Sequence, residues 1–148
     1  MIVRIPRVPS VFSRIIAGEL PGHFVWKDGD CVAFLSNRPV RPGHTLVVPR
    51  LEVDRWLDLE PELLSHLMLV AQKLGTAIQH GFGAVRVGLT IAGHEVPHAH
   101  IHLVPIHSLG ALDYTRVDPG PRAADLEMAA ETIRASLRAL GISEPGGV

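Results

Sequence analysis

Three histidines stand at every second position of a short apolar segment, and this spacing constrains the fold more than any other feature of the chain. Residues 98–104 read His-Ala-His-Ile-His-Leu-Val, so small or apolar residues separate His98, His100 and His102. Side chains on a β-strand alternate between its two faces. An extended segment therefore places all three imidazoles on one face and the intervening side chains in a core, whereas a helix would scatter the rings. Because imidazole can act near neutral pH as a base, an acid, a nucleophile or a metal ligand, the segment predicts a functional site on one face of a sheet.

The spacing alone leaves three interpretations of this site open. The histidines could be catalytic, they could hold a zinc ion on one face of the sheet, or they could form an exposed histidine-rich strand without a role. Neutral imidazole is a common zinc ligand, so the choice depends on what else the chain contains.

Further segments upstream of the histidines favour the catalytic interpretation. Residues 12–18 are followed by Glu-Leu-Pro, residues 33–35 read Ala-Phe-Leu, and residues 42–49 read Pro-Gly-His-Thr-Leu-Val-Val-Pro. Together with the pattern His-φ-His-φ-His-φ-φ, in which φ is hydrophobic, this order resembles the histidine triad (HIT) family over roughly Ser10 to Ile106. Within that family, the chain looks like the bacterial nucleoside phosphoramidase-like hydrolases.

The apolar pattern predicts an α+β fold, which is a HIT-like antiparallel β-sheet with one long central helix and a C-terminal helix. We expect a single domain over residues 1–148, with an extended arm at 1–9 and the HIT core at 10–106. In the N-terminal half we expect a short helix N-capped by Ser10 and running to Ala17, a hairpin of strands 24–27 and 31–35 around Asp28-Gly29, and a strand at 44–48. A long helix then starts at Pro61 and ends at Gly81, and a strand at 85–91 pairs with 96–104 across Gly93. A loop at 108–120 leads to a helix at 121–140, which Gly141 ends.

Composition and charge exclude several classes of protein. A chain of 148 residues is long enough to bury the core of one domain. The formal net charge of -1 gives no global attraction to nucleic acid or to an anionic membrane, so we expect neither a nucleic acid polymer nor a membrane among the partners. The lone cysteine, Cys31, rules out an intramolecular disulfide and fits a reducing compartment, and no segment has the pattern of a signal peptide or a membrane span. We therefore expect a cytoplasmic protein.

The resemblance implies a role for each histidine. The middle residue, His100, would attack a phosphoryl centre and form a covalent nucleotidyl-histidine, which water then hydrolyses. His98 and His102 would support the phosphate and its proton transfers, and His44 would complete the cluster. We therefore predict a nucleotide hydrolase or nucleotidyl transferase that needs no cofactor and cleaves a nucleoside monophosphate from an amine, a phosphate or a second nucleotide. A nucleotide-binding regulatory module with vestigial catalysis and a metal-binding protein that uses the histidine face are the alternatives.

Further residues are expected to contact the nucleotide. Ser36, with Asn37 beside it, stands where the family has an acidic residue that bonds the ribose hydroxyls. His94, followed by Glu95, stands where the family has a glutamine that helps to hold the phosphate. These departures leave the nucleobase and the leaving group open. Two aromatic candidates for a base-binding cleft, for which plain core packing is an equal alternative, are Phe12 and Phe34.

The resemblance also bears on metal binding. Many bacterial relatives hold a structural zinc ion with a Cys-x-x-Cys pair near the start of the chain, a histidine after the Val-Pro segment, and the first histidine of the triad. The matching positions here are Ser10, Ser13 and Glu52, beside His98. Because too few suitable ligands remain for a closed tetrahedral site, we expect no structural zinc and assign no metal ligand.

We also expect a homodimer. The strand at 85–91 and the helix at 61–80 resemble the elements through which family members dimerise. On that helix, Leu64, Met68 and Leu69 widen the apolar stripe beyond what one core face needs, and such an excess is usually buried against something. Cover by the C-terminal helix of the same chain is the alternative.

Overall fold

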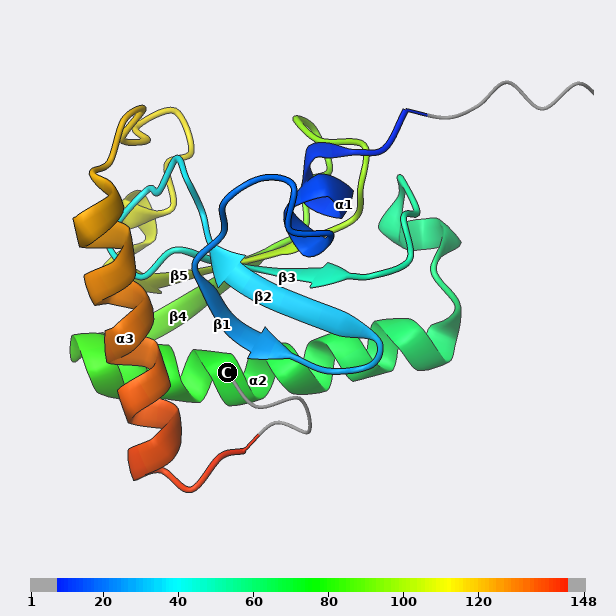
Figure 1. The fold of residues 1–148 in the computed structure, drawn as a ribbon. Coiled ribbons are helices and arrows are strands. Elements are labelled where there is room, and N and C mark those ends of the chain that lie inside the picture. Colours follow the sequence, from blue (N-terminus) through cyan, green and yellow to red (C-terminus); the bar gives the residue numbers. More distant parts are fainter. Residues whose placement is uncertain (1–7, 144–148) are drawn as a thin grey trace, which may run out of the picture.

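A single five-stranded antiparallel sheet forms the centre of the computed structural model, which describes residues 8–143 (Figure 1). Its spatial order is β1-β2-β3-β5-β4. The strands are β1 (Phe24–Lys27), β2 (Cys31–Leu35), β3 (Thr45–Pro49), β4 (Arg86–Thr90) and β5 (Ile101–Ile106). The helices are α1 (Val11–Ile16), α2 (Pro61–Phe82) and α3 (Ala123–Ala139), with 3-10 turns at Trp56–Asp58 and Leu109–Ala111. The predicted α+β class, with one long helix and a C-terminal helix on an antiparallel sheet, is confirmed, and most of the expected N-terminal arm lies outside the described residues.

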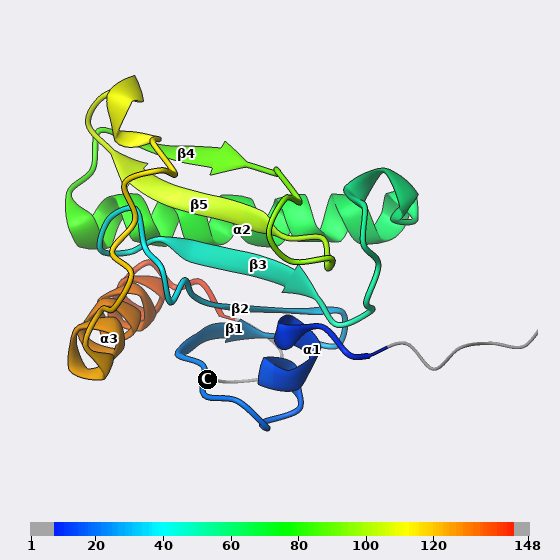
Figure 2. The same ribbon diagram turned by 90° about the horizontal axis from the view of Figure 1, so that it is seen from above.

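The two faces of the sheet have different partners. Helix α2 runs along one face, and α1 lies on the other (Figure 2). Because strand side chains alternate, Ile101 and Leu103 are buried in the core against α2, as the sequence predicts. Phe34 points to the opposite face, where it packs against Phe12 of α1. His102 therefore lies on the α1 face, away from the long helix.

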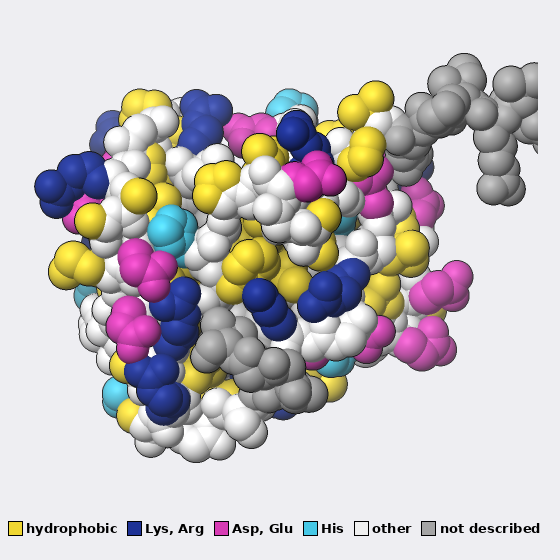
Figure 3. All heavy atoms as spheres, viewed as in Figure 1, with side chains coloured by type: hydrophobic (Ala, Val, Ile, Leu, Met, Phe, Trp, Pro, Cys, Tyr) yellow, Lys and Arg dark blue, Asp and Glu magenta, His cyan; other side chains and the backbone are white. Residues whose placement is uncertain are grey.

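Helix α3 is fastened to the edge of the sheet and to α2. Arg134 donates from Nε to the carbonyl oxygen of Phe24 at 2.9 Å and pairs with Glu127 at 2.6 Å. Figure 3 shows basic and acidic side chains close together over this helix. On α2, a Cβ atom added at Gly81 would lie 2.6 Å from the hydroxyl oxygen of Ser136, so the glycine permits the close approach of the two helices.

The end of α2 differs from the prediction. The sequence predicts a stop at Gly81, but the helix continues to Phe82 and ends at Gly83, whose φ of 59° is left-handed. Glycine is used both at a left-handed C-cap and where two backbones come close, and the sequence alone does not separate these uses. Helix α3 begins two residues later and ends one residue earlier than predicted. Among residues 8–143, none of the helices is both long and apolar enough to cross a membrane.

The histidine segment is a regular strand only in its second half. The predicted antiparallel pairing of residues 85–91 with the histidine segment is confirmed, since β4 pairs with β5 from Thr90 opposite His102 to Arg86 opposite Ile106. The second strand was expected to start at residue 96 but starts at Ile101, so the connection around Gly93 is longer than predicted. Pro97 has no N–H group to donate to a neighbouring strand. The N–H of Ala99 donates instead to the carbonyl oxygen of Val53 at 2.7 Å. Only the third histidine of the triad lies within β5.

Candidate active site

The backbone holds one ring nitrogen of His100. Its Nδ1 is 2.7 Å from the carbonyl oxygen of His98, and since a carbonyl oxygen only accepts, Nδ1 carries the proton and Nε2 carries the free lone pair. The His100 ring packs edge-on against Phe12, with 4.8 Å between the ring centroids. Burial lowers the pKa of His100 below its ordinary value, although the hydrogen bond to His98 offsets part of this effect. A neutral imidazole with a free lone pair is suited to nucleophilic attack.

A backbone N–H group fixes the proton positions on a second pair of histidines. The N–H of Val40 donates to Nδ1 of His44 at 3.0 Å, so the proton of neutral His44 is on Nε2. That nitrogen is 2.9 Å from Nδ1 of His102, which must therefore accept. The proton of neutral His102 is consequently on Nε2, from which it can be donated to an oxygen atom of a substrate.

Burial keeps these histidines uncharged. It lowers the pKa of His44 to about 3, and the neighbouring rings of His102 and His100 add to the effect. It also lowers the pKa of His102 to about 4, again with a contribution from His100. The pKa of His98 is lowered for the same reason. At neutral pH the cluster can therefore act through lone pairs and N–H groups, without a positive charge of its own.

A cleft of about 690 Å³ opens over the histidines on the α1 face of the sheet. Phe12 and Phe34 line it, with their ring centroids 5.6 Å apart in an edge-to-face contact. Both rings are also buried in the core of this face, so core packing and cleft lining are combined in the same side chains. The residues predicted for the site that line the cleft are Phe12, Phe34, Ser36, Asn37, His44, Glu95, His100 and His102.

Two other residues predicted for the site lie outside the cleft wall. His94 is exposed in the connection between β4 and β5 and is not a lining residue. His98 is fully buried, and its Nε2 donates to the carbonyl oxygen of Pro49 at 2.8 Å. His98 therefore reaches the cleft only indirectly, through its carbonyl oxygen, which accepts from Nδ1 of His100.

A hydrogen-bonded cluster joins the start of α1 to His98. Because Nε2 of His98 donates, its Nδ1 accepts, and the hydroxyl of Ser10 donates to it at 2.6 Å. Oε1 of Glu52 accepts from the N–H of Ser10 at 2.6 Å and from the hydroxyl of Ser13 at 2.7 Å, and these bonds lower the pKa of Glu52. The four positions considered for zinc therefore do converge. Two hydroxyl groups and one carboxylate that satisfy one another do not form a zinc ligand set with a single imidazole, so these residues do not fit a structural zinc ion.

The segment after β5 supplies residues that the sequence-based prediction missed. The ring of Tyr114 packs against those of His102 and His44, with centroids 5.1 and 5.9 Å away. The N–H of Asp118 donates to the carbonyl oxygen of Pro39 at 2.9 Å and holds this segment beside the cleft. The only sequence signal was a lone tyrosine in a polar loop. Further lining residues from this part of the chain are Val117, Pro121, Ala123 and Leu126.

The comparisons with known proteins agree with this geometry. The family model of the HIT domain matches residues 17–109, which is more than half of the chain, and the protein belongs to the HIT family. An uncharacterized HIT-like protein of Saccharolobus solfataricus is 34% identical over 103 residues, which cover 66% of this chain and 74% of that protein.

Solved structures show the same fold. A hypothetical histidine triad nucleotide-binding protein from Sulfolobus tokodaii has a TM-score of 0.77 at 27% identity, and the match covers 87% of this chain and 92% of the other. A Zn-bound histidine triad family protein from Mycobacterium smegmatis has a TM-score of 0.76 at 30% identity and covers 88% and 94%. The family and the HIT-like fold expected from the sequence are thereby confirmed.

Proposed function

We propose that this protein is a nucleotide hydrolase or nucleotidyl transferase that forms a covalent nucleotidyl-histidine on His100. Membership of the HIT family supports a nucleotide-binding, hydrolase-type function in general, and the similar Sulfolobus tokodaii protein is named as nucleotide-binding. The observation that carries the proposal is the 2.7 Å hydrogen bond between His100 Nδ1 and the His98 carbonyl oxygen, which leaves Nε2 unprotonated at the cleft.

In the proposed reaction, Nε2 of His100 donates its lone pair to the phosphorus atom of a nucleoside monophosphate group. A P–N bond forms as the bond from phosphorus to the leaving group breaks, and the departing amine, phosphate or nucleotide takes up a proton from water. The N–H of His102 donates to a non-bridging oxygen, where negative charge develops. Water then attacks phosphorus and releases a proton to solvent, which balances the proton taken up by the leaving group, and the P–N bond breaks to free the nucleoside monophosphate and neutral His100.

The cleft residues are assigned by their chemistry to parts of the nucleotide. Phe12 and Phe34 offer ring edges and faces to a nucleobase. Ser36 and Asn37 offer a hydroxyl and an amide to the ribose, which bond it more weakly than a carboxylate would. Glu95 lines the cleft, with His94 exposed beside it, and we keep both as proposed contacts of the substrate.

We further propose that the protein is a homodimer and is cytoplasmic. Met68 and Leu69 of α2 are 42% and 57% exposed, and Leu89 of β4 is 43% exposed. These residues line a hollow of about 790 Å³ between α2 and β4, and no residue of α3 contributes to it. A second copy related by a two-fold axis would cover this apolar face, since a self-complementary surface is the commonest route to a dimer.

Turnover of a substrate panel tests the proposal. The panel combines adenosine and guanosine phosphoramidates with dinucleoside polyphosphates, and mass spectrometry after acid quenching detects the nucleotidyl-enzyme. We expect His100→Ala to lower turnover by on the order of 10³-fold or more and to abolish the adduct while nucleotide binding persists. His107→Ala, an exposed histidine just beyond β5, is the matched control.

Two outcomes would overturn the proposed function. Near-wild-type turnover by His100→Ala would remove the covalent mechanism. Nucleotide binding without turnover of any compound in the panel would favour the regulatory module.

A further inference from the structure

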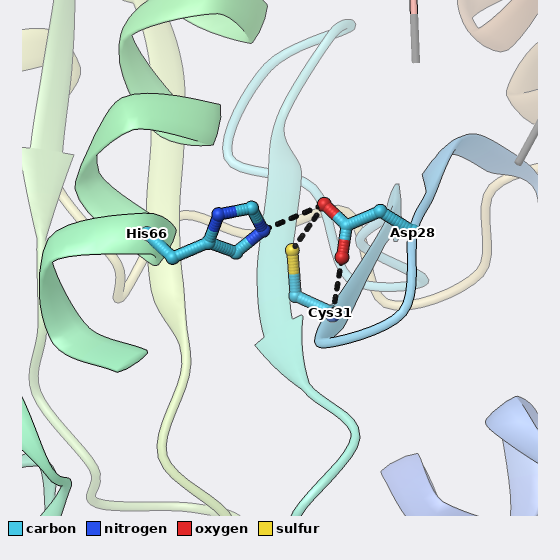
Figure 4. A group of neighbouring side chains, drawn as sticks. All are labelled: Asp28, Cys31 and His66. Carbon is cyan, nitrogen blue, oxygen red and sulfur yellow. Dashed lines mark hydrogen bonds and ion pairs between the residues drawn. The ribbon is translucent and has the colours of Figure 1, made fainter. Parts of the chain in front are cut away.

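Three side chains with metal-binding atoms converge at the end of β2 that is distant from Ser36 and the cleft. Asp28 stands in the turn between β1 and β2, Cys31 begins β2, and His66 projects from α2 toward them (Figure 4). Their ligand atoms all lie within 4.8 Å of one another. Oδ2 of Asp28 is 2.7 Å from Nε2 of His66 and 3.5 Å from Sγ of Cys31. None of the three residues lines the cleft over the histidine triad.

We propose that Asp28, Cys31 and His66 form a binding site for a thiophilic divalent cation, with zinc as the best fit. A thiolate, an imidazole and a carboxylate are all zinc ligands, at metal distances of about 2.3, 2.0 and 2.1 Å. In a tetrahedron these distances place the ligand atoms about 3.3–3.6 Å apart. Oδ2 and Sγ already have this separation, so the His66 ring is the group that must move, by roughly 1 Å, and side-chain rotation can provide this.

Metal binding at this site releases one proton, and the charges of the ion and its ligands then balance. At present the ring N–H of His66 and the thiol of Cys31 both donate to Oδ2 of Asp28. When the cation enters, the thiol proton leaves to solvent and the remaining proton of His66 resides on Nδ1, so that Nε2 offers its lone pair. One proton is released, and the set changes from a charge of -1 to neutrality.

The carboxylate is already oriented by other groups that would remain in place. Trp26 donates from Nε1 to Oδ2 at 2.8 Å, and the N–H groups of Asp30 and Cys31 each donate to Oδ1 at 2.8 Å. Such outer hydrogen bonds hold a ligating carboxylate in position and raise the affinity of metal sites.

An entrance and a fourth ligand are available on the α2 side. The His66 side chain is 34% exposed and lines a hollow of about 390 Å³. Glu62, one turn before His66 on α2, lines the same hollow, so either its carboxylate or a water molecule can complete the tetrahedron. Glu60 and Asp30 add negative charge at the entrance, whereas Arg50 places a positive charge beside it. The carboxylates outnumber the guanidinium.

Cobalt(II) is the probe that tests the site, because a thiolate bound to cobalt gives a charge-transfer absorption that nitrogen and oxygen ligands do not give. Cys31 is the only cysteine of the chain, so this absorption reports on this site alone and not on the histidine triad. We expect the band to saturate at one cobalt per chain, to be displaced by zinc, and to be lost in Cys31→Ser and His66→Gln. His80→Gln, another histidine of α2, is the matched control and should keep the band.

The rival account is that the cluster only ties the hairpin to α2 through hydrogen bonds. A folded wild-type protein that shows no thiolate band with excess cobalt supports this rival and overturns the proposal. A band that persists in His66→Gln also overturns it. Zinc-edge X-ray absorption on the wild-type protein needs no variant: one sulfur atom in the metal shell supports the site, and a shell of only nitrogen and oxygen contradicts it.

Discussion

The hydroxyl oxygen of Ser10 and Nδ1 of His98 are 2.6 Å apart, although 88 positions separate the two residues in the chain. The same oxygen accepts the N–H of Ser13 at 3.0 Å. One hydroxyl group therefore caps α1 and fixes the His98 ring. The backbone carbonyl oxygen of His98 in turn accepts from Nδ1 of His100. This relationship makes Ser10 a positioning residue for the proposed nucleophile.

Removal of the Ser10 hydroxyl should cost both stability and catalytic rate. We expect Ser10→Ala to lower the free energy of unfolding by about 1–3 kcal/mol, because a buried acceptor loses its donor and α1 loses its cap. It should lower kcat more than it changes KM, since His98 holds the nucleophile and not the substrate. Denaturant unfolding and steady-state kinetics measure the two effects. Ser10→Thr, which keeps the hydroxyl, should restore much of the rate, and exposed Ser108→Ala should change neither quantity. An Ser10→Ala variant with unchanged stability and kcat would contradict the assignment.

His44 and His102 should make the free energy of unfolding depend on pH between about 5 and 7, which is above the range in which carboxylates titrate. The folded-state pKa is about 3 for His44 and about 4 for His102, whereas both residues take up protons near 6.5 in the unfolded chain. Below pH 6.5 the unfolded state therefore binds more protons, and the free energy of unfolding should fall as the pH falls, by up to about 1.4 kcal/mol per pH unit for each histidine. Urea unfolding between about pH 7 and pH 5 measures this slope. His44→Gln should flatten it and His107→Gln should not, so equal slopes in the two variants would argue against buried neutral histidines.

Tyr114 should control the acid limb of the pH–rate profile. Its ring covers His102 and His44, and burial is the main cause of their lowered pKa values. Tyr114→Ala admits water, so the pKa of His102 should rise toward its ordinary value. A protonated His102 can no longer accept from Nε2 of His44, which orients its ring, so the acid limb of kcat/KM should move up by about one pH unit. Tyr114→Phe keeps the ring and should keep the profile. The prediction fails if both variants give the same acid limb.

The apolar face of α2 should govern assembly. Met68→Glu places a charge in the hollow between α2 and β4, and the cost of burying that charge should shift a homodimer to the monomer. Sedimentation velocity at micromolar concentration gives the mass directly. Met128→Glu, at an exposed methionine of α3, is the matched control and should leave the dimer intact. A wild-type protein with the mass of one chain would exclude the dimer.

Local signals predicted most of the fold. The alternation around His102 correctly predicted that Ile101 and Leu103 lie in the core, because the periodicity of a strand depends only on neighbouring residues. The same alternation wrongly extended the strand back to residue 96, since the path of that segment is decided by the missing N–H of Pro97 and by a contact with Val53. The end of α2 was predicted at Gly81, but this glycine allows the close approach of α3, and a contact between two helices cannot be predicted from neighbouring residues alone.

The site was predictable only where a motif marks it. His100 and His44 belong to recognisable segments, and the structure brings both to one cleft. Tyr114 belongs to none, and its place against His102 depends on how the segment after β5 returns across the loop at 37–43. The approach of Glu52 to Ser10 could be expected only from the family resemblance, because no local pattern joins them.

The wall of the cleft extends past the segment by which the family is known. The HIT domain model ends at residue 109, but Tyr114, Val117 and Leu126 lie beyond it and line the same cleft as the histidines. The histidines that we propose as the reacting groups and part of the wall that would contact the substrate thus lie in separate stretches of the chain. Substitutions in the second stretch can therefore reshape the cleft wall while the three histidines stay unchanged.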